Sequence, residues 1–200
     1  MTLSAEVQAY IDRQPSYGWR RKLMQAIGGF ISFKLMWRMT FTGMDNIPAS
    51  GPVIIMINHT ASPDPVVCMA GIKPRYVIPM TKAENLDSPL MRFLVTFWGA
   101  YPVKRGEIDR KALMNSIELL KAGQMILIAP EGTRSNGLQE AKDGLTYIAT
   151  KSDAVIVPTG ISGAIGWKEN LKAFKRTRIR VNFGKPFKFK TGGERVPRDV

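Results

Sequence analysis

Short apolar runs that alternate with helical patterns are the feature that most constrains the fold of this chain. From residue 52 onward, runs of β-type residues are separated by segments with helical periodicity or helix-start signals. The expected strands are Pro52–Ile57, Tyr76–Met80, Ala100–Val103, Met125–Ala129, Ala154–Val157 and Arg178–Phe183. Strands that alternate with helices form a largely parallel sheet with helices on its faces. We therefore predict an α/β fold with a largely parallel mixed sheet flanked by helices.

Two of the expected helices have clear boundary signals. Ser88 followed by Pro89 marks one helix start, and the periodic segment Asp109–Ala122 is stopped by Gly123. Two hundred residues, of which 44% are hydrophobic, can bury one sizeable core but leave little room for a second. We therefore predict a single α/β domain over residues 43–200, preceded by an N-terminal helical segment over residues 1–42.

The net charge of +13 is concentrated at the two ends of the chain. Residues 1–42 hold six Lys and Arg against two Asp and Glu, and residues 167–200 hold eleven against three. The span between them is nearly neutral, with twelve against eleven. Basic ends on a neutral body indicate a surface that faces lipid headgroups or nucleic acid. Charge alone does not choose between these two partners.

The N-terminal segment favours lipid. Its uncharged stretch Leu23–Phe33 would extend about 16 Å as a helix, against a bilayer core about 30 Å thick, and the start of the chain does not resemble a signal peptide. Basic and apolar side chains are mixed around this stretch, namely Arg20, Arg21, Lys22, Lys34 and Arg38 with Leu23, Ile27, Phe30, Ile31, Leu35 and Trp37. We predict an amphipathic interfacial helix on an anionic membrane surface. A helix packed on the core with solvated charges is the alternative.

Polar motifs follow four of the expected strands at their carboxyl ends. The motifs are Asn58–Pro65, Lys104–Gly106, Pro130–Arg134 and Pro158–Gly160. Ligand sites of open α/β sheets lie beyond these ends, because the loops converge there while the core stays packed. We therefore expect the four motifs to contribute to one site.

His59 is the only histidine of the chain, and Asp64 follows it across a turn. Pro63 pushes Ser62 out of the helical region, so Ser62 can cap a helix in whose first turn Asp64 falls. A carboxylate there can hold one imidazole nitrogen and leave the other free to take a proton from a hydroxyl. His59 and Asp64 are therefore the candidate catalytic base and its partner. A structural histidine beside a helix-capping aspartate is the alternative.

The sequence lacks the residues that metal-dependent or nucleophilic catalysis would need. One His and one Cys cannot assemble a zinc site of the usual kind, so no metal is expected. Cys68 lies in an apolar helical pattern and is expected to pack in the core, and Gly160–Gly163 lacks the spacing of a serine nucleophile elbow. The attacking oxygen should therefore belong to a substrate or to water. A single cysteine also indicates a reducing, cytoplasmic setting.

Three cations follow neighbouring strand ends. Lys104 and Arg105 form a compact pair and Arg134 is the third, and ammonium and guanidinium groups suit a phosphate. Gly132 lets the backbone come close to a ligand, and Glu131 could hold an arginine or an acceptor hydroxyl in place. A lone Lys-Arg pair is commonly solvated surface charge, but three cations at converging strand ends favour phosphate binding.

In this order the motifs resemble those of the PlsC-like glycerolipid acyltransferase family, from about Met44 to Gly163. The H-x4-D block is matched by His59–Asp64, the second block by Gly99–Arg105, the E-G-T-R block by Pro130–Arg134 and the fourth block by Val157 and Pro158. The His-Asp spacing alone is common by chance, but four blocks in family order are specific. Ala61 and Ala129 depart from the pattern, since many members have Ser and an aromatic residue there, and these departures leave the acceptor open.

The resemblance implies transfer of a fatty acyl group from acyl-CoA or acyl carrier protein to the free hydroxyl of 1-acyl-sn-glycerol 3-phosphate. The product would be phosphatidic acid, in phospholipid biosynthesis, with no cofactor beyond the donor substrate. It implies that His59 is the base and Asp64 its partner. The substrate-binding residues would be Lys104, Arg105 and Arg134 on the phosphate, with Glu131, Gly132 and Thr133 in the acceptor site.

The expected location is the cytoplasmic face of the cell membrane, as a peripheral or monotopic protein. Relatives often continue into a further helix beyond the position of Val200. A trimmed or short form of the family is therefore expected for this chain. One alternative function is acyl transfer to another lyso-lipid, such as a lyso-ornithine lipid or a glycolipid. The other is a non-catalytic basic module on membrane or nucleic acid, for which Phe174, Phe183, Phe187 and Phe189 could supply aromatic rings. Their spacing fits strand positions equally well, so no nucleic-acid partner is expected.

Overall fold

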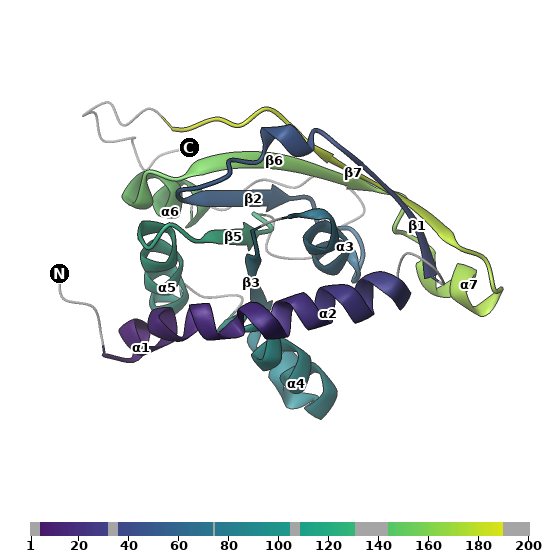
Figure 1. Cartoon of the computed structure of the whole chain (residues 1–200), viewed down its shortest axis with the longest axis horizontal. Coiled ribbons are helices and arrows are strands. Elements are labelled where there is room, and N and C mark those ends of the chain that lie inside the picture. The colour runs from purple at the N-terminus through teal and green to yellow at the C-terminus, as the bar shows by residue number, and fades with distance from the viewer. Residues whose placement is uncertain (1–4, 32–35, 74, 105–108, 131–143, 190–200) are drawn as a thin grey trace.

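A computed structural model describes residues 5–31, 36–73, 75–104, 109–130 and 144–189, which contain seven strands, seven α-helices and three short 3-10 helices, Gln14–Tyr17, Met44–Asn46 and Ala83–Asp87. The strands are β1 (Trp37–Thr42), β2 (Val53–Ile57), β3 (Val77–Lys82), β4 (Tyr101–Val103), β5 (Met125–Ile128), β6 (Val155–Ser162) and β7 (Thr177–Phe183). The helices are α1 (Ala5–Arg13), α2 (Gly18–Ile31), α3 (Asp64–Gly71), α4 (Pro89–Trp98), α5 (Arg110–Lys121), α6 (Gly144–Ser152) and α7 (Trp167–Lys172). Figure 1 shows β2, β3 and β5 at the centre, with α5 and α6 to their left, α3 to their right and α2 below, while β6, β7 and β1 run along the upper and right-hand edge.

The strands form one sheet in the order β1-β7-β6-β2-β5-β3-β4. Every neighbouring pair among these described strands is parallel except β6 with β7. The predicted α/β fold with a largely parallel mixed sheet is therefore confirmed. The five strands from β2 through β6 in chain order run in the same direction, so their carboxyl ends lie at the same edge of the sheet. Strand β2 lies in the middle of the sheet, between β5 and β6.

Both faces of the central strands are buried. Ile54, Ile126 and Ile156 point into a core cluster with α5 and α6, whereas Ile55 and Val157 point into a second cluster with α3. Strands covered on both faces need continuous apolar runs, and this need explains why the β2 and β5 segments contain almost no polar residue. Helices on both faces hold the strand ends in place as a rigid base for the loops that follow them.

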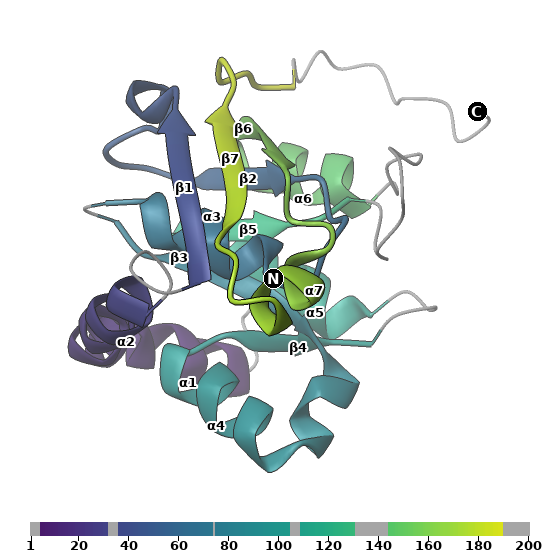
Figure 2. The same ribbon diagram turned by 90° about the vertical axis from the view of Figure 1, so that its right-hand side faces the viewer.

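The segment Trp37–Thr42 forms β1, not the end of the expected N-terminal helix. Helix α2 ends at Ile31, and β1 pairs in parallel with β7. Trp37 is buried and Arg38 is exposed, which is the alternation of a strand with one covered face, so the placement of these two residues on an interfacial helix was wrong. Lys34 and Leu35 lie outside the described residues. Figure 2 shows β1 and β7 side by side, turned steeply against β2.

Two expected helix boundaries are confirmed. Helix α4 begins at Pro89 after Ser88, and α5 begins after Asp109, whose side chain accepts a hydrogen bond of 2.9 Å from the backbone N–H of Ala112. Gly123 follows α5 with φ +74°, a conformation that favours glycine and stops the helix. None of the helices in the described ranges is both long and apolar enough to cross a membrane.

Candidate active site at the carboxyl end of strand β2

The candidate base lies directly after the central strand. His59 follows β2 by two residues, and only 7% of it is exposed. The preceding residue, Asn58, fixes the chain at this point. Its Nδ2 donates to the carbonyl of Ile161 over 2.9 Å, and its Oδ1 accepts from the N–H of Ile161 over 2.7 Å. Asn58 therefore ties the turn before His59 to strand β6.

Asp64 is fully buried in the first turn of α3 and binds the loop that carries the histidine. Its Oδ2 accepts hydrogen bonds from the backbone N–H groups of Thr60, at 2.8 Å, and Ala61, at 2.7 Å. The same oxygen lies 3.4 Å from Nδ1 of His59. Hydrogen bonds to a carboxylate are strong, so they fix both the loop and the carboxylate beside the imidazole. The structure thus brings the two predicted catalytic residues together, with Nε2 of His59 on the other side of the ring.

The expected cap by Ser62 is wrong. Pro63 is the residue that precedes α3, and no side chain caps the helix there. The Ser62 hydroxyl instead accepts a hydrogen bond of 3.2 Å from Nε1 of Trp167 in α7. The Asp64 carboxylate already binds the backbone of the turn, so Ser62 is left to join α3 to a helix about a hundred residues later in the chain.

Lys104 is the one predicted phosphate-binding residue that falls within the described ranges. It is exposed and follows β4, the edge strand that lies three positions from β2 in the sheet. Three strand spacings of roughly 4.8 Å separate β4 from β2, so a long side chain is needed to approach the site from there. Arg105, Glu131, Gly132, Thr133 and Arg134 lie outside the described residues. The strand that precedes the Pro130–Arg134 motif is β5, the direct neighbour of β2.

Asp109 has a role at this edge that the sequence did not assign. Its Oδ2 accepts a hydrogen bond of 2.9 Å from the N–H of Lys104, while Oδ1 caps α5. Desolvation raises the pKa of Asp109, but backbone hydrogen bonds from Lys104, Ala112 and Lys111 outweigh it and lower the pKa below its usual value. The ionised carboxylate therefore ties Lys104, the residue after β4, to the start of α5. The sequence signal was an aspartate as the first residue of the periodic segment Asp109–Ala122.

The family model for acyltransferases matches residues 38–162, well over half of the chain. The matched span contains the His59–Asp64 pair and the strand ends described above. This chain belongs to the acyltransferase family. The expected family is thereby confirmed.

Individual acyltransferases show the same likeness. Over 142 residues the chain is 28% identical to the 1-acyl-sn-glycerol-3-phosphate acyltransferase of Bacillus subtilis, covering 71% of this chain and 70% of that protein. It is 32% identical over 125 residues to the enzyme of the same name from Borreliella burgdorferi, of which it spans half the length. The crystal structure of the LPA acyltransferase PlsC from Thermotoga maritima superposes with a TM-score of 0.68 at 22% identity, over 91% of this chain and 75% of that one. This structural likeness shows the shared fold.

Cys68 lies one helical turn after Asp64 in this acyltransferase and is fully buried. Burial raises the pKa of the Cys68 thiol far above its ordinary value, and the neighbouring Asp64 carboxylate raises it further. The thiol therefore stays protonated at neutral pH. A protonated, buried thiol is not a nucleophile, in agreement with the expected packing role.

We expect Cys68→Ala to keep acyl transfer within about twofold of wild type, because the thiol contributes packing and no chemistry, and to lose about 1 kcal/mol of unfolding free energy. Steady-state rates and urea unfolding measure the two effects. In parallel, iodoacetamide at pH 8 should leave the folded protein unmodified and alkylate the urea-unfolded chain. A large loss of turnover by a fully folded Cys68→Ala protein would contradict this assignment.

Proposed function

We propose that this acyltransferase moves a fatty acyl group from acyl-CoA or acyl carrier protein to the free hydroxyl of 1-acyl-sn-glycerol 3-phosphate, giving phosphatidic acid. The observation that carries the proposal is the buried His59–Asp64 pair at the carboxyl end of β2. The names of the relatives from Bacillus subtilis and Borreliella burgdorferi support this acceptor. No cofactor is needed, because the two substrates hold every group that is exchanged.

The proposed chemistry is direct transfer with His59 as general base. Asp64 faces Nδ1, so Nε2 takes the proton of the acceptor hydroxyl as its oxygen attacks the thioester carbonyl carbon. The carbon–sulfur bond then breaks, and the leaving thiolate takes the proton back from His59. Asp64 stabilises the positive charge that the imidazole carries between these two proton transfers. Ester and thiol are the products, and the enzyme returns to its starting state.

In the proposed complex, cations after the strand ends hold the acceptor phosphate. Lys104, Arg105 and Arg134 would bind the phosphate, and Glu131, Gly132 and Thr133 would line the acceptor site. We expect Arg105→Ala to raise the KM for 1-acyl-glycerol 3-phosphate by about tenfold or more and to change the KM for the donor little, because charged hydrogen bonds to phosphate are lost. Steady-state kinetics against each substrate measure this difference. Lys121→Ala, an exposed cation at the far end of α5, is the control.

The acceptor itself is tested with a panel of lyso-lipids. Purified protein is incubated with acyl-CoA and, in separate reactions, with 1-acyl-glycerol 3-phosphate, lyso-ornithine lipid, lysophosphatidylcholine or a glycolipid. We expect kcat/KM to be highest for 1-acyl-glycerol 3-phosphate. A higher value for any other acceptor would replace the proposed substrate, and no transfer to any acceptor would exclude the enzymatic function.

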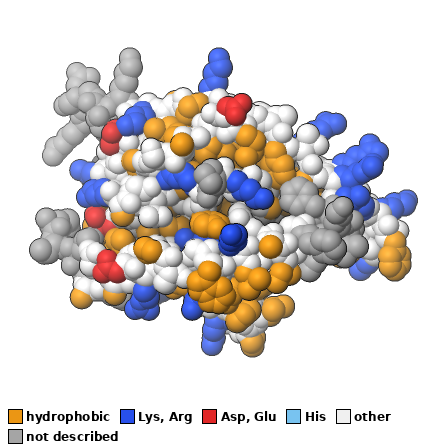
Figure 3. Space-filling view, in the orientation of Figure 1, with side chains coloured by type: hydrophobic (Ala, Val, Ile, Leu, Met, Phe, Trp, Pro, Cys, Tyr) orange, Lys and Arg blue, Asp and Glu red, His pale blue; other side chains and the backbone are white. Residues whose placement is uncertain are grey.

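An exposed apolar surface supports the proposed contact with an anionic membrane at the cytoplasmic face of the cell membrane. On α2 the exposed residues Trp19, Leu23 and Ile27 recur every four residues, and α4 exposes Leu90, Met91, Phe93 and Leu94. Aromatic packing joins the two helices, since the ring centroids of Trp19 and Phe97 lie 5.8 Å apart in an edge-to-face arrangement. We call these seven exposed residues the α2–α4 surface. Figure 3 shows apolar side chains gathered over α4, with lysines and arginines nearby.

We expect Leu90→Glu/Phe93→Glu to weaken binding to phosphatidylglycerol vesicles by about tenfold or more, because two large apolar side chains no longer enter the lipid. Vesicle sedimentation measures the bound fraction. Leu171→Glu/Phe174→Glu is the matched control, with the same charge change at two exposed apolar residues near α7. Equal loss of binding by both double variants would contradict a docking role for the α2–α4 surface.

A further inference from the structure

An arginine-lined hollow of about 750 Å³ lies against β1, β7 and the end of β6. Four arginines line it, namely Arg38, Arg176, Arg178 and Arg180, and none of the acidic residues that the structure describes does. The volume falls within the range of roughly 300 to 1,000 Å³ that is usual for small-molecule sites. We call it the arginine hollow.

Strand register brings the arginines together. Arg38 pairs with Arg178 across β1 and β7, and Arg180 pairs with Ser162 of β6. In the part of the chain that the structure describes, the side chains of Arg38, Arg178 and Arg180 form no hydrogen bond or ion pair. Like charges directly opposite one another destabilise a sheet. The cluster therefore lowers the stability of the fold unless an anion binds there.

Arg176 is held at the rim of the arginine hollow, because it donates a hydrogen bond of 3.0 Å to the carbonyl of Trp37. Gly163 closes the wall on the β6 side. It has φ +82°, and a Cβ atom at this position would collide with the carbonyl oxygen of Arg178. The backbone of β6 and β7 can meet this closely only with glycine there. The hollow is thus formed by packed backbone as well as by exposed side chains.

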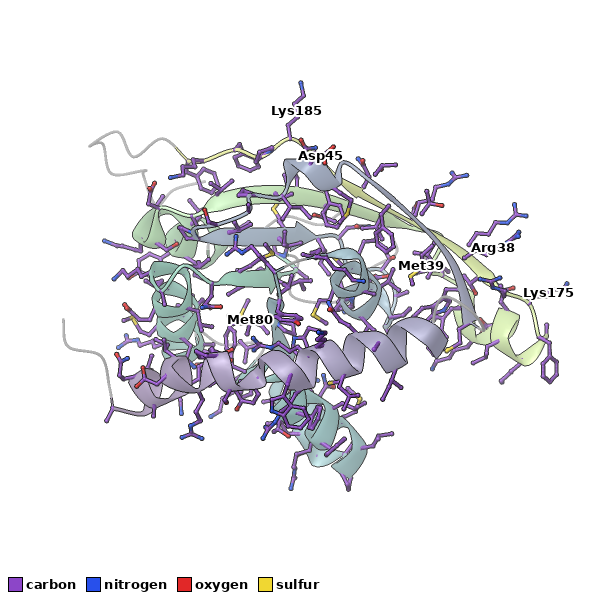
Figure 4. All side chains as sticks on the ribbon, in the orientation of Figure 1. Arg38, Met39, Asp45, Met80, Lys175 and Lys185 are labelled. Carbon is purple, nitrogen blue, oxygen red and sulfur yellow. The ribbon has the colours of Figure 1, made fainter. Side chains whose placement is uncertain are left out.

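The arginine hollow faces away from the α2–α4 surface. Ile179 and Val181 of β7 pack into the core cluster that contains α3, so Arg178 and Arg180, which alternate with them, point to the opposite face of the sheet. Helix α2 lies on the α3 side, where Gln25 donates to the carbonyl of Met69. Figure 4 shows Arg38 extending outward, away from α2 and α4. A membrane at the α2–α4 surface would therefore leave this hollow open to water.

The arginine hollow also adjoins the end of β6, which Asn58 ties to the turn that carries the candidate base. Ser162 and Gly163 line it immediately after Ile161, the residue whose backbone Asn58 binds on both sides. Asn58 in turn directly precedes His59. The end of β6 therefore links the wall of the hollow to the turn that carries the imidazole.

We infer that the arginine hollow binds the phosphate groups of coenzyme A, the soluble carrier of the acyl donor. Guanidinium groups bind phosphate through paired hydrogen bonds, and coenzyme A carries a diphosphate and a ribose phosphate at the end opposite its thiol. The long pantetheine arm between these ends would carry the thioester past β6 to His59. A concave site of this volume suits a nucleotide better than the surface of an acidic carrier protein. The inference rests on the proposed function, since it assigns the donor of that reaction.

Binding of free coenzyme A tests the inference without requiring catalysis. Isothermal titration calorimetry compares wild type, Arg178→Gln/Arg180→Gln, and the control Lys121→Gln/Lys185→Gln, which removes the same charge from exposed sites outside the hollow. We expect the arginine variant to bind coenzyme A about tenfold to a hundredfold more weakly, and the control to bind it like wild type. Equal affinities in all three proteins would overturn the inference. Thermal unfolding verifies that each variant folds.

Pantetheine, which lacks every phosphate, separates phosphate binding from general damage. Its affinity should be the same in the three proteins. If the arginine variant lost as much affinity for pantetheine as for coenzyme A, the assignment would be overturned. Arg178→Lys/Arg180→Lys keeps the charge and loses the paired hydrogen bonds. Its affinity for coenzyme A should therefore lie between those of wild type and the Gln variant.

Kinetics with three donors distinguish the carriers. For the Gln variant, the KM for acyl-CoA should rise relative to the KM for acyl-pantetheine by the factor found in calorimetry. If the KM for acyl-loaded carrier protein rose while the KM for acyl-CoA did not, the hollow would be assigned to the protein carrier and our inference would be overturned. If wild type binds coenzyme A through these arginines but acylates no lyso-lipid, the proposed function fails while the assignment of the hollow stands.

Discussion

His59→Ala should lower kcat for acyl transfer by a factor of about 10² to 10⁴, the usual contribution of a positioned general base. The imidazole lies beyond the carboxyl end of the central strand, with its Nδ1 3.4 Å from Oδ2 of Asp64, and alanine leaves no group there that can accept the hydroxyl proton. Single-turnover rates with acyl-CoA and 1-acyl-glycerol 3-phosphate measure the chemical step directly.

The KM for the acceptor should change little in His59→Ala, because the phosphate is bound elsewhere in the proposed site. The variant should also fold normally, since the Asp64 carboxylate still accepts from the backbone of Thr60 and Ala61. Added imidazole offers a further check, because a small base that enters the vacated space should restore part of the rate. Equal turnover by wild type and variant would leave His59 as a structural residue only.

Asp64→Asn should lower both activity and stability. An amide cannot stabilise the imidazolium as a carboxylate does, so we expect kcat to fall by roughly 10² to 10⁴. Weaker hydrogen bonds to the N–H groups of Thr60 and Ala61 should cost about 1 to 3 kcal/mol of unfolding free energy, since the carboxylate is fully buried. Urea unfolding and single-turnover rates measure the two losses separately.

Val67→Ala is the matched control for Asp64→Asn. Val67 is a fully buried apolar residue of the same helix, α3, and its truncation should lower stability by a similar amount, about 1 to 3 kcal/mol, while leaving the imidazole and carboxylate in place. If both variants lost equal stability and equal activity, Asp64 would act only as the cap of the turn. That outcome would favour the alternative of a structural histidine beside a capping aspartate.

The strands of the central sheet and the closeness of His59 to Asp64 could be predicted because their signals are local. Continuous apolar runs such as Val53–Ile57 mark strands buried on both faces, and the Ser88–Pro89 pair marks a helix start without reference to any partner. His59 and Asp64 lie five residues apart across one turn, so a short segment of chain already places them side by side. Arg105 and Glu131–Arg134 remain predictions, because they lie outside the described residues.

Only the tertiary structure decided the features that depend on partners far along the chain. Strand β1 has the same mixture of basic and apolar residues as an interfacial helix, and its pairing with β7, about 140 residues away, selects the extended form. The same long-range register places Arg38 beside Arg178 and so creates the arginine hollow. Ser62 bonds to Trp167 instead of capping α3 for the same reason. The sequence by itself determined which segments are apolar and placed His59 and Asp64 five residues apart after the strand predicted at Pro52–Ile57, because each of these is fixed by neighbours in the chain. Contacts between distant segments depend on how the sheet twists and closes, and no local pattern encodes that.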